Sequence, residues 1–99
     1  MKLLGKKLLD NFKRTHVDSR SQIDSWQAEV EEARWNTPSD LKGRYPKASL
    51  LASHQGSQQV IFDLCGNKYR LLVLVNYKNG IVLVKKIDKH SKYDKWKLG

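Results

Sequence analysis

Residues 58–88, QQVIFDLCGNKYRLLVLVNYKNGIVLVKKID, decide the fold of this chain. Aliphatic and β-branched residues fill three runs, which are typical of strands, and Gly66-Asn67 and Asn79-Gly80 separate them. Asn and Gly accept the positive φ that tight hairpin turns require. The stretch therefore predicts three antiparallel strands, over residues 58–65, 68–77 and 81–88. Residues 47–52 can add a fourth.

Two-residue turns would fix which residues of neighbouring strands pair, and the pairing fixes the two faces of the sheet. Around Gly66-Asn67, the expected pairs are Phe62 with Leu71, Val60 with Val73, and Asp63 with Arg70. Around Asn79-Gly80, they are Lys78 with Ile81, Leu74 with Lys85, Leu72 with Ile87, and Arg70 with Lys89.

One face of this predicted sheet is continuously apolar and has to be covered by helices. Its members are Val60, Phe62, Leu64, Tyr69, Leu71, Val73, Val75, Tyr77, Val82 and Val84. The other face is mixed, with two basic residues set among aliphatic ones. It comprises Gln59, Ile61, Asp63, Arg70, Leu72, Leu74, Asn76, Leu83, Lys85 and Ile87.

The first half of the chain has the spacing of helices. Residues 2–4 can form a short strand before Gly5, and a helix with one apolar face follows from residue 6 to about residue 16. Residues 19–22, SRSQ, predict a capping box for a second helix. Thr37-Pro38 opens a third, short helix. Residues 90–96 can form one or two helical turns, so the fold class is α+β in a single domain over residues 1–99.

The charge is uneven along the 99 residues. The net charge is +9, with +1 in residues 1–36 and +8 in residues 37–99. A basic half on a small domain favours a polyanionic partner, most often a nucleic acid. The alternative is a basic protein without such a partner.

Several function classes find no support in the sequence. Cys65 is the single cysteine, so an internal disulfide or a multi-cysteine metal site is excluded, and a reducing cytoplasm is the expected compartment. The longest apolar run, residues 71–75, is far too short to cross a membrane. No phosphate-binding loop, dinucleotide motif or serine elbow is present. We expect neither a metal nor a cofactor.

The mixed face has the residue types that bind and cut RNA. Arg70 and Lys85 can hold a phosphodiester and stabilise its transition-state charge, His90 can move a proton near neutral pH, and Tyr93 can stack on a base or donate a proton. Simpler roles stay open: Arg70 can pair with Asp63, and the other three can be ordinary surface or edge residues.

The whole chain resembles the HigB-type toxins of bacterial toxin–antitoxin systems, in the RelE-like superfamily of mRNA interferases. Three segments carry the resemblance: WQAEVEEARWNTPSDLKGRYPKASLL at 26–51, VIFDLCGNKYRLL at 60–72, and KHSKYDK at 89–95. The last segment is similar to the family's T-H-x-E-Y-D ending. Lys89 stands in place of the usual Thr, and Ser91-Lys92 in place of an acidic variant, so the local charge is more positive.

The resemblance implies helices packed on one face of an antiparallel sheet with a short C-terminal helix. It also implies metal-independent cleavage of mRNA on the ribosome, and neutralisation by a helix-turn-helix antitoxin of the HigA type, through which operator DNA is contacted only indirectly. The expected catalytic residues are Arg70, Lys85, His90 and Tyr93. The expected RNA-binding residues are Arg44, Lys47, Lys68, Lys86, Lys89 and Lys92.

Two other functions remain open from the sequence. A non-catalytic RNA- or ribosome-binding module would use the same basic face, and it would tolerate the loss of His90 and Tyr93. A transcriptional co-regulator would touch DNA only through its antitoxin.

Overall fold

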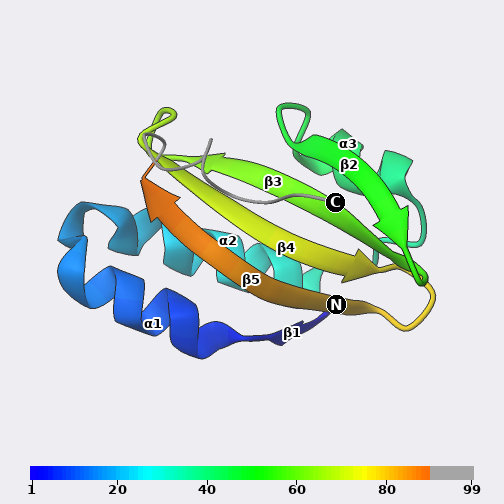
Figure 1. Ribbon diagram of the computed structural model, residues 1–99, viewed down its shortest axis with the longest axis horizontal. Coiled ribbons are helices and arrows are strands. Elements are labelled where there is room, and N and C mark those ends of the chain that lie inside the picture. Colours follow the sequence, from blue (N-terminus) through cyan, green and yellow to red (C-terminus); the bar gives the residue numbers. More distant parts are fainter. Residues whose placement is uncertain (90–99) are drawn as a thin grey trace.

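The computed structural model describes residues 1–89, which form three helices, a single 3₁₀ turn and five strands (Figure 1). In chain order they are β1 (Lys2–Leu4), α1 (Lys6–Thr15), the 3₁₀ turn Val17–Ser19, α2 (Arg20–Glu32), α3 (Pro38–Arg44), β2 (Ser49–His54), β3 (Ser57–Leu64), β4 (Tyr69–Asn76) and β5 (Ile81–Lys89).

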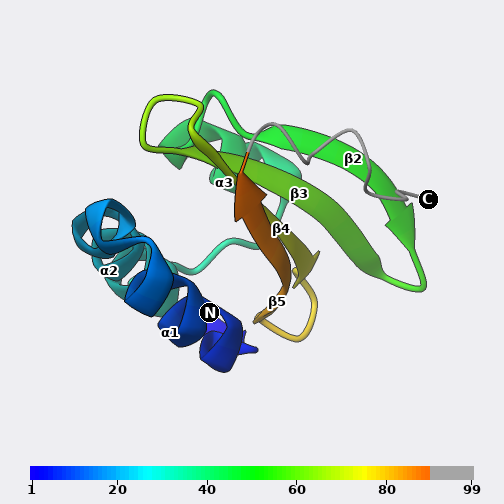
Figure 2. The ribbon, with the colours of Figure 1, turned by 60° about the vertical axis from the view of Figure 1, so that its left-hand side comes forward.

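The strands form one sheet in the order β1-β5-β4-β3-β2. The pairs from β2 to β5 are antiparallel, and the short β1 runs parallel to β5 at the edge. Helices α1 and α2 lie against one face of the sheet, as Figures 1 and 2 show from two directions. The α+β architecture predicted from the sequence is confirmed. We call the sheet face opposite α1 and α2 the open face, a name that refers only to the helices within residues 1–89.

The core lies between the helices and the predicted apolar face. Trp26 of α2 packs edge-on against Phe62 of β3, with ring centroids 5.4 Å apart, and Phe12 of α1 packs edge-on against Tyr69 of β4 at 5.0 Å. Leu41 of α3 belongs to the same apolar cluster. Nine of the ten residues expected on this face are buried, and Tyr77 is partly buried against the cluster.

The start of α3 agrees with the sequence prediction, and the start of α2 does not. Thr37 caps α3 with the reciprocal hydrogen bonds of a capping box, in which Asp40 is the partner. The capping box predicted at residues 19–22 is wrong. The Ser19 hydroxyl donates to the His16 carbonyl at 2.6 Å, and the Gln22 side-chain oxygen accepts the Cys65 N–H at 2.6 Å. Gln22 thus joins α2 to the β3–β4 turn.

The register between β3 and β4 is the predicted one, and it places Asp63 opposite Arg70. The register predicted between β4 and β5 is wrong. Ile81 pairs with Asn76 instead of Lys78, because the turn has four residues, 77–80. Gly80 has a positive φ of 68°, whereas Asn79 does not, so this turn lacks the two positive φ values of a type I′ hairpin. The Asn76 side chain accepts the Asn79 N–H at 2.9 Å and supports the wider turn.

A register shift further along β5 changes the partners a second time. Val84 pairs with Val73 and Lys86 pairs with Leu72, so Lys85 is the additional residue of a bulge. The wider turn alone places Leu74 opposite Leu83 instead of Lys85. Beyond the bulge, Arg70 lies opposite Asp88 instead of Lys89, and Leu72 lies opposite Lys86 instead of Ile87. Because a one-residue shift exchanges the two faces, Ile87 packs against the core instead of joining the mixed face.

The predicted helical turns at residues 90–96 lie outside the described residues. No helix within residues 1–89 is long and apolar enough to cross a membrane.

Candidate functional site

Arg70 is the central basic residue of the open face. Its guanidinium forms an ion pair with the Asp63 carboxylate of the neighbouring strand, and its Cα partner on the other side is Asp88. The Arg70 and Asp63 side chains retain 18% and 25% of their exposure, respectively. Two aliphatic residues of the same face, Ile61 and Leu72, are buried beside this pair. The open face therefore offers a fixed, partly desolvated guanidinium, which is the kind of group that stabilises phosphate charge.

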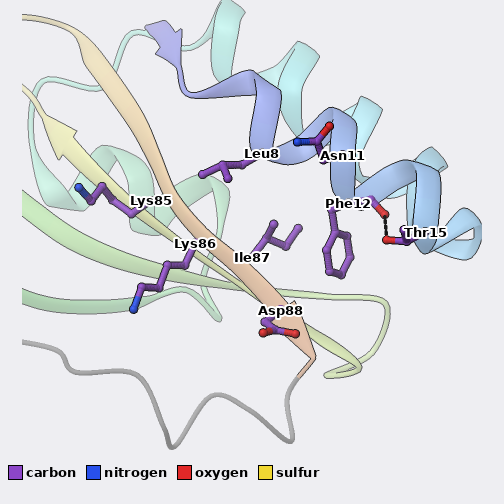
Figure 3. A pocket seen from close by; sticks show the side chains of 8 residues that line it. All are labelled: Leu8, Asn11, Phe12, Thr15, Lys85, Lys86, Ile87 and Asp88. Atoms are coloured by element: carbon purple, nitrogen blue, oxygen red, sulfur yellow. Dashed lines mark hydrogen bonds between the residues drawn. The ribbon is translucent and has the colours of Figure 1, made fainter.

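The bulge in β5 decides which lysine joins Arg70. Lys86 lies opposite Leu72 and therefore has its Cα on the open-face row next to Arg70 and Asp88. Figure 3 shows Ile87 directed toward Phe12 of α1 and Lys86 directed away from that helix. Lys85, the basic residue expected beside Arg70, lies at the bulge. Together with Lys86, it contributes to the lining of a hollow of about 450 Å³ between α1 and β5.

Arg44 and Lys47 lie beside the edge of β3. They line a pocket of about 300 Å³ with Tyr45, Pro46, Ala48, Phe62 and Asp63. This pocket opens where β2 stops pairing with β3, because the last pair is Ser49 with Ile61. Asp63 also lines this pocket, but its carboxylate pairs with Arg70 of β4, whereas Tyr45 and Arg44 of the pocket contact Glu29 of α2. The pocket is therefore at the edge of β3, apart from the Arg70 row.

Lys68, another predicted RNA-binding residue, is bound to Asp18 at the turn between β3 and β4. Its ammonium lies 2.6 Å from the Asp18 carboxylate, which also accepts the Tyr69 hydroxyl at 2.8 Å. The hydrogen bond from Lys68, followed by that from Tyr69, lowers the pKa of Asp18, and the same bond to Asp18 raises the pKa of Lys68. Lys68 therefore anchors the β3–β4 turn to the residues before α2, and its charge is largely matched there.

Lys89 is exposed at the end of β5, opposite Tyr69. The expected site residues His90, Lys92 and Tyr93 lie outside the described residues. Among residues 1–89, the structure therefore places Lys86 and Asp88 on the Arg70 row, whereas Arg44 and Lys47 lie at the pocket beside the edge of β3.

Three residues were absent from the sequence prediction: Asp88 on the Arg70 row, and Glu29 and Tyr45 at the pocket beside β3. Asp88 was missed because its place opposite Arg70 depends on the bulge. Glu29 and Tyr45 were missed because they meet only in the fold: the Tyr45 hydroxyl donates to Glu29, and Glu29 also pairs with Arg44 at 2.5 Å. Burial and then the hydrogen bond to Glu29 raise the pKa of Tyr45, so this phenol stays protonated at neutral pH.

The described part of the chain contains no cluster of three or more His, Cys, Asp or Glu side chains that could hold a metal ion. What residues 1–89 do supply is positive charge, from Arg70 anchored by the Asp63 carboxylate and from Lys86 on the same row. This arrangement suits the binding of a phosphodiester and the stabilisation of added negative charge on it.

A small α+β chain with N-terminal helices on one sheet face and an arginine-centred open face has the architecture expected of a RelE-like toxin. A family model described as "HigB_toxin, RelE-like toxic component of a toxin-antitoxin system" matches residues 19–96. The chain belongs to this family. It is also similar to the mRNA interferase HigB of Escherichia coli O6:H1, with 22% identity over 95 residues that cover 96% of this chain and 90% of that protein.

Proposed function

We propose that this chain is an endoribonuclease that cleaves mRNA on the ribosome, and that it acts in the cytoplasm as the toxin of a type II toxin–antitoxin pair. A HigA-type antitoxin with a helix-turn-helix domain neutralises it, and operator DNA is contacted only through that antitoxin. The observation that carries the proposal is the Arg70–Asp63 ion pair at the centre of the open face, in a chain of the HigB toxin family. The similarity to a protein named mRNA interferase supports the choice of substrate.

The proposed reaction uses a nucleophile from the RNA itself. The 2′-hydroxyl next to the scissile phosphate attacks the phosphorus, the 5′-oxygen leaves, and a 2′,3′-cyclic phosphate results. Arg70 stabilises the charge that the phosphate oxygens gain in the transition state. Lys85, the residue expected from the sequence, and Lys86, the residue on the Arg70 row, are the two candidates for a second cation. His90 is the general acid or base, and Tyr93 positions a base or the leaving group.

The test is cleavage of ribosome-bound mRNA by the purified chain, either untreated or treated with EDTA and then freed of the chelator, because EDTA in the assay would remove the Mg²⁺ that ribosomes require. We expect unchanged cleavage by the treated chain, cyclic phosphate ends, and no cleavage of mRNA with a 2′-deoxy or 2′-O-methyl sugar at the cut site. Efficient cutting of the blocked RNA would show that water is the nucleophile and would overturn this mechanism.

A non-catalytic RNA-binding module remains the second candidate, because Arg70 and the lysines would serve binding equally well. His90→Gln and Tyr93→Phe separate the two functions. Neither changes formal charge at neutral pH, so RNA affinity at two salt concentrations should stay near that of the wild type. A general acid or base contributes about 100- to 10,000-fold in rate, so His90→Gln should lose most cleavage. Wild-type rates in both variants would remove these two residues from the mechanism.

A further inference from the structure

We propose that Asp63 is a positioning residue of the RNA cleavage reaction and acts only through Arg70: its carboxylate holds the guanidinium where it stabilises the charge of the transition state. The inference rests on the proposed function and deepens it, because it gives a role in the reaction to a residue that the sequence placed only in an ion pair. The register of the sheet, the burial of the pair and the charge around it carry the inference.

The register fixes the direction of the arginine side chain. Arg70 of β4 and Asp63 of β3 are direct partners in the antiparallel ladder, and the ion pair joins Arg70 Nη1 to Asp63 Oδ1. Directly opposed residues on one face have Cβ atoms about 4.5–5.5 Å apart. A flexible arginine side chain can reach over a wide area of a sheet, whereas a bond to the residue directly opposite directs it toward β3. Asp63 therefore determines where on the open face this positive charge lies.

The pair is the most buried ion pair in the described part of the chain. Its two side chains retain 18% and 25% of their exposure, whereas every other ion pair within residues 1–89 has at least one side chain that is 47% exposed or more. The neighbouring pair on the same face is Ile61 with Leu72, which are 1% and 5% exposed. A charged hydrogen bond is stronger in such surroundings than in water, so the guanidinium is oriented before a substrate binds.

The charge of Asp63 opposes RNA binding, so affinity for RNA does not explain the residue. A carboxylate repels phosphate and offsets part of the attraction of the arginine. The general attraction for a polyanion comes from the excess of basic residues, which is +8 over residues 37–99. Asp63 should therefore weaken the affinity for RNA slightly.

The benefit of a fixed guanidinium lies in the transition state. Hydrogen-bond donors that already point at the developing charge need no reorganisation during the reaction. A misplacement of about 1 Å can cost about 100-fold in rate. Asp63 should therefore raise the rate of cleavage through the position that it gives to Arg70.

A double-mutant cycle between Asp63→Asn and Arg70→Ala tests whether Asp63 acts through Arg70. The measurements are the maximal cleavage rate of ribosome-bound mRNA at saturating protein and the protein concentration that gives half of that rate. Asp63→Asn keeps the shape of the side chain and removes its charge, so we expect a maximal rate about 10- to 100-fold lower, with an unchanged or lower half-saturating concentration. In the Arg70→Ala background, Asp63→Asn should cause no further loss, because no guanidinium is left to position.

Two further variants separate position from charge. Asp63→Glu keeps the charge and moves it by one methylene, so its maximal rate should lie between those of Asp63→Asn and the wild type. Glu32→Gln removes one negative charge from an exposed residue at the end of α2 and should leave both quantities near those of the wild type. Thermal unfolding shows whether each variant folds. If Asp63→Asn does not fold, Asp63→Glu and its double variant with Arg70→Ala decide the matter by the same criteria.

A measurement without cleavage completes the test. The ¹⁵N relaxation of the Arg70 Nε–H group gives its order parameter, which we expect to be lower in Asp63→Asn than in the wild type. An unchanged order parameter, or losses that multiply in the double variant, would overturn the inference. Absence of cleavage by the wild type would reject the proposed function and this inference with it. Cleavage by the wild type and by both Asp63 variants at the same maximal rate would reject this inference alone.

Discussion

Asp63 and Arg70 form an ion pair across the β3–β4 ladder, on the sheet face opposite α1 and α2. The carboxylate orients the guanidinium, and both side chains are mostly buried, which fixes the position of one positive charge on this face. Because the pair is partly desolvated, removal of Arg70 alone would leave the Asp63 carboxylate without its partner, which costs stability. A role of Arg70 in folding and a role at a bound phosphate therefore have to be separated by experiment.

Arg70→Ala tests that explanation. We expect growth arrest to be lost and mRNA cleavage to fall about 100- to 1,000-fold, as it does when one group that stabilises transition-state charge is removed. The measurements are growth after induction and cleavage rate, with thermal unfolding of both proteins alongside. A fall in melting temperature large enough to account for the lost activity would favour a structural role for the pair.

Lys86→Met and Lys85→Met form a matched pair, since each removes one charge from adjacent positions of β5. Because Lys86 is on the Arg70 row, we expect its loss to weaken RNA binding and to reduce the slope of log affinity against log salt by about 0.7, the value for one phosphate contact on single-stranded RNA. Lys85→Met should leave the slope unchanged. The opposite ranking would support Lys85, the residue that the sequence pattern favoured.

The two hairpins show how far the sequence determines the site. Gly66-Asn67 predicted the β3–β4 register correctly, and with it the Asp63–Arg70 pair. Asn79-Gly80 is a stronger hairpin signal, yet it gave the wrong register, because the Asn76 side chain supports a four-residue turn. The bulge at Lys85 has no sequence signal, since two adjacent lysines are tolerated on either face of an exposed strand.

The pocket at Tyr45 could not be predicted from the sequence for a different reason. Its members come from the end of α3, the connection to β2 and the edge of β3, and Glu29 of α2 holds two of them. No local spacing relates these segments. Arg44 and Lys47 were predicted to bind RNA, and they lie at this pocket because β2 stops pairing with β3 there.

Asp18 predicts a pH dependence of stability. Its pKa is lowered in the folded protein, chiefly by the hydrogen bond from Lys68. The ionised carboxylate therefore stabilises the fold above its unfolded pKa of about 3.9, and this contribution is lost as the pH falls through the lower folded value. We expect Asp18→Asn to lower the melting temperature at pH 7, and the difference from the wild type to shrink below about pH 4.

Lys68→Met is the companion variant, because it removes the main cause of the lowered pKa and leaves the Asp18 carboxyl in place. An NMR titration of the Asp18 side chain should then give a pKa closer to its ordinary value. The difference in melting temperature between Lys68→Met and the wild type should also shrink at acid pH, as it does for Asp18→Asn. An unchanged Asp18 titration in this variant would mean that Tyr69 alone holds the carboxylate.

Gly5 and Gly43 give a matched test of the junction between β1 and α1. Gly5 has a φ of 81°, and an added Cβ would lie 2.7 Å from the Val84 carbonyl oxygen of β5. The left-handed conformation costs a residue with a Cβ about 1–2 kcal/mol, and the contact with β5 adds to that cost. Gly5→Ala should therefore lower the free energy of unfolding by more than this amount.

Gly43 lies in α3 with nothing within 4 Å of its ideal Cβ, so Gly43→Ala should raise the free energy of unfolding by about 0.5–1 kcal/mol. Urea denaturation of the two variants measures both changes. Equal stabilities would mean that β1 separates from β5 at little cost, and the parallel edge strand would then contribute little to the fold.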